Sequence, residues 1–286
     1  MTNDTAPSTL QHLHRPEGSI GYDVTGTGPL VVLVPVMGDL RSTYRYLVPV
    51  LVAAGYRVAS TDLRGHGDSD PTFSTYGDAA TGSDLVALIE ELGAGATGAV
   101  VVGNSMGAGA AVWAAAERAD LVRGLVLVGP FVRDGKVSAI QRILLRVAMT
   151  PLWAAASWKS YLPKLYAGRR PDDFDAHRDA IVASLKGAGR AKAFCLTTRI
   201  SHAEAQARLG SVHAPTLVVM GELDPDFPSP ADEAAWIAGQ LQGTVVMVPE
   251  SGHYPQSQRP DVTGAAVLEF LGSLPNRDGN EAGSGA

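Results

Sequence analysis

Residues 99–119 read AVVVGNSMGAGAAVWAAAERA, and this stretch decides the fold. A short apolar run typical of a buried strand ends at Gly103, and a run of small, helix-forming residues follows Ser105. The G-x-S-x-G pattern is typical of a strained strand-to-helix turn, in which the glycines let the two segments cross without Cβ clashes. Such a turn places Ser105 at the carboxyl edge of a parallel sheet, where these sheets bind ligands. Ser105 is therefore predicted to be a nucleophile; the alternative is a structural turn with an incidental serine.

Further apolar runs of the same kind predict the rest of the sheet. They lack polar alternation, which is typical of strands covered on both faces, and they occupy residues 30–35, 56–61, 124–129, 216–221 and 244–249. Helical patterns at 83–93 and from Pro260 onward alternate with them, so we expect an α/β fold with a mostly parallel, doubly wound sheet. Residues 19–29 before the 30–35 run predict an antiparallel edge hairpin with its turn at Gly26 to Gly28.

One interval, residues 131–210, contains no strand-like run and only helical patterns, including an apolar stripe of Ile140, Ile143, Leu144 and Val147. We interpret it as a helical cap, or lid, inserted between two strands. The core domain is then expected in two parts, 18–130 and 211–274. The polar, glycine-rich ends, 1–17 and 275–286, are predicted to be flexible.

Composition excludes several classes of function. The chain has 286 residues and a net charge of -6 with no basic block, which argues against nucleic-acid binding. No run is long and apolar enough for a membrane span or signal peptide, so a cytoplasmic protein is expected. The single cysteine, Cys195, excludes an internal disulfide and is expected to be buried. No phosphate-binding loop is present, so a nucleotide cofactor is not expected. We predict no other cofactor, and no metal. A composition rich in Ala, Gly and Arg suggests a bacterial source.

A serine hydroxyl needs a base, and that base needs an orienting acid. Asp224 follows the 216–221 run and His253 follows the 244–249 run, so both are expected at the same sheet edge as Ser105. The chain order Ser105, Asp224, His253 is the one this kind of turn predicts. Asp226 and Glu222 are rival acids. The remaining histidines fit less well by position: His12, His14, His66, His177, His202 and His213.

On these motifs, the chain resembles the α/β-hydrolase-fold serine hydrolases of the small, capped esterase and lactonase type. The resemblance covers about residues 18–272 and rests on GNSMG (103–107), GELDP (221–225), SGHYP (251–255) and DLRGHGDSD (62–70). It implies a catalytic triad and a structural role, not a catalytic one, for His66 and Asp68. Serine in place of aspartate at position 105 excludes the dehalogenase and epoxide-hydrolase branches of the family.

The sequence departs from the family's pattern after the third strand. Relatives usually carry His-Gly there, whereas this chain has Pro35-Val36. In this register the N–H groups of Met37 and Met106 are predicted to form the oxyanion hole. The valine disfavours a positive φ and either narrows the acyl pocket or weakens the hole. In an alternative register, shifted by two residues, Gly38 takes the place of the glycine and Asp39 that of the donor.

We therefore expect a carboxylesterase-like serine hydrolase acting on a small to medium, apolar ester. Val36, Trp153, Trp158 and Tyr161 are candidate pocket residues, although the aromatic ones would equally serve to pack the cap. The expected partner is a small-molecule ester, with no nucleic acid and no membrane, and a homodimer is left open. The alternatives are a lactonase, a C–C hydrolase or a perhydrolase of the same fold, a slow-turnover ligand sensor, and a catalytically dead relative.

Overall fold

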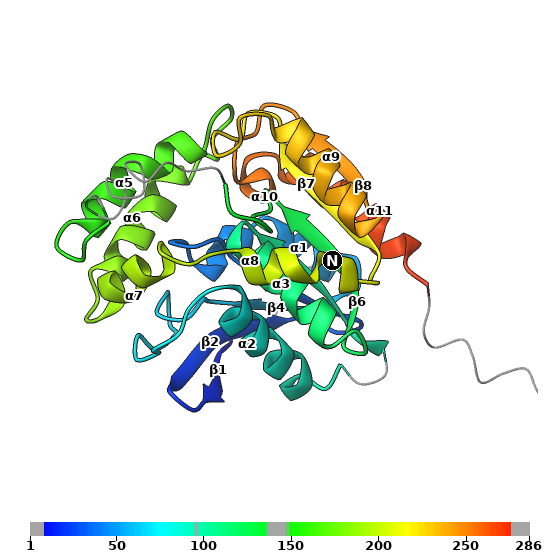
Figure 1. Cartoon of the computed structure of the whole chain (residues 1–286), viewed down its shortest axis with the longest axis horizontal. Coiled ribbons are helices and arrows are strands. Elements are labelled where there is room, and N and C mark those ends of the chain that lie inside the picture. Colours follow the sequence, from blue (N-terminus) through cyan, green and yellow to red (C-terminus); the bar gives the residue numbers. More distant parts are fainter. Residues whose placement is uncertain (1–8, 95–96, 136–146, 148, 276–286) are drawn as a thin grey trace, which may run out of the picture.

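The computed structural model describes residues 9–94, 97–135, 147 and 149–275 (Figure 1). Its strands form one sheet in the order β1-β2-β4-β3-β5-β6-β7-β8. The strands are β1 (Thr9–Arg15), β2 (Gly18–Thr25), β3 (Leu30–Val34), β4 (Arg57–Thr61), β5 (Ala99–Asn104), β6 (Val122–Val128), β7 (Thr216–Gly221) and β8 (Thr244–Val248). All pairs from β4 to β8 are parallel, whereas β1–β2 and β2–β4 are antiparallel. The predicted mostly parallel α/β sheet is confirmed.

Helices cover both faces of the sheet. Successive residues of a strand point to opposite faces, so neighbouring residues of one strand pack against different helices. The core helices include η1 (Arg41–Tyr44), α1 (Leu47–Ala53), α2 (Asp78–Glu91), α3 (Met106–Glu117), α9 (Pro230–Leu241), α10 (Pro255–Gln258) and α11 (Pro260–Ser273). Val32 and Val34 of β3 pack in one core cluster with α2, α3 and α9, whereas Val31 and Leu33 pack in the other with α1 and α11. No helix of the described residues is long and apolar enough to span a membrane.

A group of helices stands away from the sheet as a cap (Figure 1). It comprises α5 (Ala154–Leu165), α6 (Phe174–Leu185) and α7 (Arg190–Thr197), which pack on one another through a third apolar cluster. This cluster contains Cys195, which is buried as predicted, and also Val36 and Tyr254 of the core. The cap therefore closes over the loops that follow β3 and β8.

The predicted cap boundary at residue 210 is wrong, because α8 (Ala203–Arg208) packs on α3 and α2 of the core. Its Ala205 is buried in the core cluster. Three members of the predicted apolar stripe (Ile140, Ile143 and Leu144) lie outside the described residues. The fourth, Val147, is exposed.

The predicted flexible N-terminus is wrong from residue 9 onward, since these residues form β1. This strand pairs with β2 along its length, buries Leu13, and is anchored where Arg15 Nε donates to Asp84 Oδ1 at 3.0 Å. Residues 1–8 and 276–286 of the predicted flexible ends lie outside the described residues.

The predicted edge hairpin is also wrong in its partner: β2 pairs with β1 and β4, not with β3. Strand β3 already has β4 and β5 as its two neighbours. The Gly26–Gly28 turn instead carries the chain past β4, with a positive φ at both glycines. A Cβ there would lie 2.4 Å from Tyr56 O or 2.2 Å from Gly55 O, which explains why the turn needs glycine.

Candidate active site

Ser105 occupies the predicted strained turn between β5 and α3, with φ 58° and ψ -118°. Both glycines of the motif are required by close backbone approach. A Cβ on Gly103 would lie 2.3 Å from Gly107 O, and one on Gly107 would lie 2.6 Å from Val34 O. A positive φ is unfavourable for serine, so the backbone of Ser105 is strained. Strain of this kind, here at the carboxyl edge of the sheet, is typical of functional sites.

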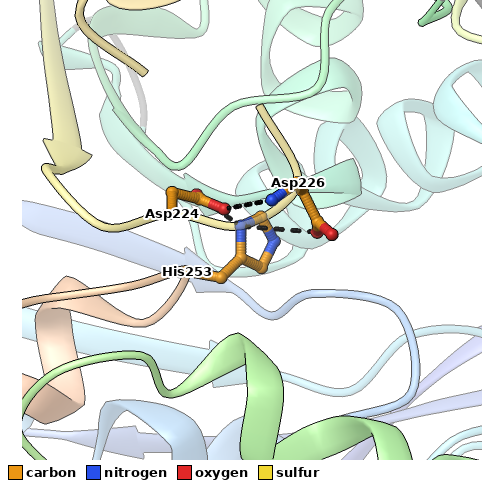
Figure 2. Close-up of side chains that lie close together, drawn as sticks. All are labelled: Asp224, Asp226 and His253. Atoms are coloured by element: carbon orange, nitrogen blue, oxygen red, sulfur yellow. Dashed lines mark hydrogen bonds and ion pairs between the residues drawn. The ribbon is translucent and has the colours of Figure 1, made fainter. Parts of the chain in front are cut away.

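His253 and Asp224 come together on the loops after β8 and β7. His253 Nδ1 lies 2.7 Å from Asp224 Oδ2, and both side chains are buried (Figure 2). Of the two rival acids, Asp226 Oδ2 lies 3.8 Å from Nδ1, and Glu222 is exposed. The backbone N–H of Asp226 also donates to Asp224 Oδ1 at 3.1 Å, which helps to hold the Asp224 carboxylate in place. The geometry favours Asp224 as the orienting acid.

The surroundings of His253 favour its protonated form. Burial of the ring opposes a positive charge, but the charge of Asp224, the hydrogen bond to it and the charge of Asp226 outweigh burial. Together they raise the pKa of His253 to about 9. A histidine held in this way is suited to take a proton from a nucleophile and to be stabilised as an imidazolium.

Polar side chains tie the serine turn to the histidine loop. Asn104, which precedes Ser105, donates from Nδ2 to His253 O at 3.2 Å and accepts a hydrogen bond from Gln256 Nε2 at 2.9 Å. Gly129 lies beside the pair, since a Cβ there would be 3.1 Å from His253 Nδ1. Within the described residues Ser105 Oγ makes no hydrogen bond, so a direct contact with His253 stays a prediction, and such contacts often tighten only when substrate binds.

The backbone around Met37 distinguishes between the two registers for the oxyanion hole. In the alternative register Asp39 N is the donor, but it already donates to Val36 O at 3.3 Å, and Gly38 N donates to His66 Nε2 at 3.1 Å. Neither Met37 N nor Met106 N has an acceptor among the described backbone hydrogen bonds outside helices and strands. The arrangement favours Met37 and Met106 as donors. Val36 does not require a positive φ, so the valine fits the backbone.

His66 fixes this loop from the core side, a role that the sequence did not reveal beyond a structural turn. Its Nδ1 lies 2.9 Å from Arg64 O, which can only accept, so Nδ1 carries the proton. Its Nε2 is then free to accept from Gly38 N. Burial lowers the pKa of His66 to about 4, so the ring is neutral at neutral pH.

This neutral histidine predicts a specific loss of stability in acid. A folded pKa of about 4, below the unfolded value of about 6.5, gives stability that is present above pH 6.5 and lost as pH falls toward 4. The loss attributable to His66 is up to about 3 kcal/mol of unfolding free energy. In urea unfolding between pH 7.5 and 4, the stability gap between the native chain and His66→Gln should therefore narrow as pH falls. The exposed His213→Gln is the control, and a constant gap for His66→Gln would contradict the assignment.

The four candidate pocket residues do not all reach the site. Val36 and Trp158 are buried between cap and core, with Trp158 Nε1 donating to Gly38 O at 2.7 Å. Tyr161 OH donates to Asp226 Oδ1 at 2.9 Å, beside the acid loop. Trp153 is 44% exposed and donates to Val147 O, and no described contact joins it to the catalytic loops. Trp153 is thus not supported as a pocket residue.

Two other features of the structure bear on ligands. The ligand atoms of Asp224, Asp226 and His253 lie within 4.8 Å of one another, but a metal there would have to break the bond between His253 and Asp224. A separate pocket of about 660 Å³ opens between η1 and the turn from α6 to α7. It is lined by charges such as Arg41 and Arg45, which are paired with aspartates, and by none of the candidate site residues. Its location argues against a role in the reaction.

Comparison with known proteins gives consistent matches. A sequence profile of the alpha/beta hydrolase family matches residues 31–266. The 2-(acetamidomethylene)succinate hydrolase of Mesorhizobium japonicum is 28% identical over 258 residues, covering 86% of this chain and 89% of that one. Three mycobacterial relatives are 31% identical over 160 residues, and the match spans only 45% of their length and 56% of this chain.

Solved structures share the fold over nearly the whole chain. A bromoperoxidase from Bacillus anthracis superposes with a TM-score of 0.80 at 22% identity, covering 93% of this chain and 99% of that one. A thermophilic esterase from Thermogutta terrifontis gives a TM-score of 0.73 at 23% identity, covering 93% and 98%. At these identities the likeness concerns the fold.

Proposed function

The chain belongs to the alpha/beta hydrolase family, and we propose that within it the protein hydrolyses carboxylic esters through an acyl-enzyme on Ser105. The observation that carries this proposal is the buried His253–Asp224 pair, joined at 2.7 Å on loops beside the strained serine turn. Esterase and lactonase structures are among those that share the fold, as are epoxide hydrolases. A serine at the turn supports acyl transfer, because its oxygen attacks a carbonyl carbon and leaves an ester that water can cleave.

The groups of the site have different tasks in this mechanism. His253 takes the proton of Ser105 as the oxygen attacks the ester carbonyl, and Asp224 stabilises the imidazolium that forms. The N–H groups of Met37 and Met106 stabilise the developing oxyanion. His253 then protonates the leaving alcohol, and in the second half-reaction it activates the water that releases the acid.

The walls of the site suggest the class of ester. Val36 is buried and packs against aromatic residues of the cap, which adds bulk next to the proposed oxyanion donors. We infer that the acyl group is short and apolar, and that the substrate is a free small molecule.

A substrate panel tests the proposal. The enzyme should turn over nitrophenyl acetate and butyrate many times. Hydrolysis of the octanoate should be at least about 10-fold slower, since each methylene that does not fit the pocket costs on the order of 1 kcal/mol of transition-state binding. The panel includes an acyl-homoserine lactone, a vinylogous diketone and 2-(acetamidomethylene)succinate, to detect a different hydrolase specificity. Intact mass is recorded on every sample. One acyl equivalent without further turnover would indicate a ligand sensor, and absence of any adduct or product would reject the acyl-enzyme.

A further inference from the structure

Each of the cap helices α5, α6 and α7, the ones within the described residues, contacts the oxyanion loop, defined as residues 36–40. From α5, Trp158 Nε1 donates to Gly38 O at 2.7 Å. From α6, His177 Nε2 lies 2.8 Å from Asp39 Oδ1. From α7, Phe194 packs on Gly38, because a Cβ there would be 2.7 Å from Phe194 Cε2 and equally close to Trp158. The loop is thus enclosed by the cap.

The contact between Asp39 and His177 is the most consequential of the three. Both side chains are buried, and Asp39 Oδ1 also accepts from Leu40 N at 2.7 Å. Asp39 Oδ2 is buried with no hydrogen-bond partner in the part of the chain described. Removal of His177 would leave a buried carboxylate with only a local backbone donor, which is costly enough to shift the loop.

The core holds the two ends of the same segment through backbone groups. Gly38 N donates to His66 Nε2, and Leu40 O accepts from Thr43 N at 2.9 Å, while Asp39 N donates to Val36 O within the loop itself. Between these two points, the polar partners come from the cap: the Gly38 carbonyl accepts from Trp158, and the Asp39 side chain bonds to His177. The conformation of the segment that follows Met37 therefore depends on whether the cap is docked.

We propose that the cap holds the oxyanion loop in its working shape through His177 and Trp158, so that the hole is complete only when the cap is docked. These are positioning residues: they act on the reaction through Met37 N–H. The inference rests on the proposed function for its catalytic consequence, but its structural part does not. Assembly of the hole would then coincide with docking of the cap over the bound substrate, so that the oxyanion is stabilised only once the substrate is enclosed.

The cap helix α6 offers a matched control. Asp173, at its start, pairs with Arg45 Nε of the core at 2.6 Å and does not touch the loop. Asp173→Asn removes a cap-to-core ion pair from the same helix, whereas His177→Leu removes the contact with Asp39. His177→Gln supplies an N–H donor again and is the rescue variant.

For nitrophenyl butyrate, His177→Leu should lower kcat by about 10- to 100-fold, which is at most the loss in kcat expected when one oxyanion donor is removed. KM should change by less than about 3-fold. Affinity for an alkyl boronic acid, whose adduct with Ser105 occupies the hole, should fall by a similar factor. His177→Gln should recover most of the loss, and Asp173→Asn should stay within about 3-fold of the native chain. A loss for Asp173→Asn as large as for His177→Leu would overturn the proposal, since general cap docking would explain both.

Hydrogen exchange gives a readout that does not need ester turnover. Peptides covering residues 34–42 should exchange faster in His177→Leu than in the native chain. Their exchange rate should be unchanged in Asp173→Asn. Trp158→Phe, which keeps an aromatic ring but removes the N–H to Gly38 O, tests the same point if the leucine variant does not fold. Unchanged exchange in this segment for both variants would refute the inference, even if the chain has no esterase activity. Faster exchange without native ester turnover would instead reject only the proposed function.

Discussion

Replacement of Ser105 by alanine is expected to lower kcat for nitrophenyl butyrate by about 10⁴-fold or more, because without the hydroxyl no acyl-enzyme forms. The residual rate should reflect binding and the oxyanion donors alone. The native chain should gain one adduct with a fluorophosphonate, on the peptide that contains Ser105, and the variant should gain none. Stopped-flow release of nitrophenol and peptide mass spectrometry measure the two effects.

The variant should remain folded, since alanine adopts a φ of 58° at a cost similar to that for serine and its introduction removes no described hydrogen bond. Thermal unfolding checks this point. Ser211→Ala, at an exposed serine of the 3₁₀ turn η3 (Leu209–Ser211), is the control and should keep native kinetics and labelling. Ester turnover that survives Ser105→Ala with native kcat would contradict the nucleophile assignment and the whole acyl-enzyme proposal.

The serine turn could be predicted from sequence because its requirements are local. Gly103 and Gly107 are required because the backbone approaches closely within one strand–turn–helix unit and its neighbour β3. The apolar run of β5 before the turn is itself enough to indicate a buried strand. Asp224 and His253 could be predicted because each directly follows such a run, and parallel strands end at one edge.

The edge of the sheet was harder to predict because its strands are only partly buried. In β1, six of seven residues are exposed or half-buried and only Leu13 is buried, so little apolar patterning marks the strand. Its existence depends on pairing with β2 and on the bond between Arg15 and Asp84, 69 positions apart in the chain. The same holds for the partner of β2, which is settled by the crossover that places β4 next to it.

The contacts by which residues position the site could not be predicted from the sequence, because the partners are distant in the chain. His66 sits in a glycine-rich turn, and only the structure shows that its ring accepts from Gly38 N. Gln258 is a surface-like residue in the sequence, yet its Oε1 accepts from Gly252 N at 2.9 Å and its Nε2 donates to Arg169 O at 2.7 Å. It thereby joins the histidine loop to the base of the cap. The contact between His177 and Asp39 joins positions 138 residues apart.

The Asp224→Asn variant should lose about 10³- to 10⁴-fold in kcat while remaining folded. The asparagine amide can donate to Nδ1 of His253, which places the ring proton on Nε2, where a lone pair is needed to accept the serine proton. The variant also loses the charge that contributes most to raising the pKa of His253. Pre-steady-state release of nitrophenol between pH 7 and 10 measures the loss, with circular dichroism as the check on folding.

Asp226→Asn is the comparator, because its carboxylate lies near the ring without bonding to it. Asp226 Oδ2 is 3.8 Å from Nδ1, so its replacement removes a charge but keeps the tautomer set by Asp224. The base works only when His253 is deprotonated, so kcat/KM rises as pH increases through its pKa. Removing a negative charge that raises this pKa should move the rise to lower pH, with maximal kcat within about 5-fold of native. If Asp226→Asn abolished turnover and Asp224→Asn did not, Asp226 would be the orienting acid, and the 2.7 Å contact between His253 and Asp224 would be structural.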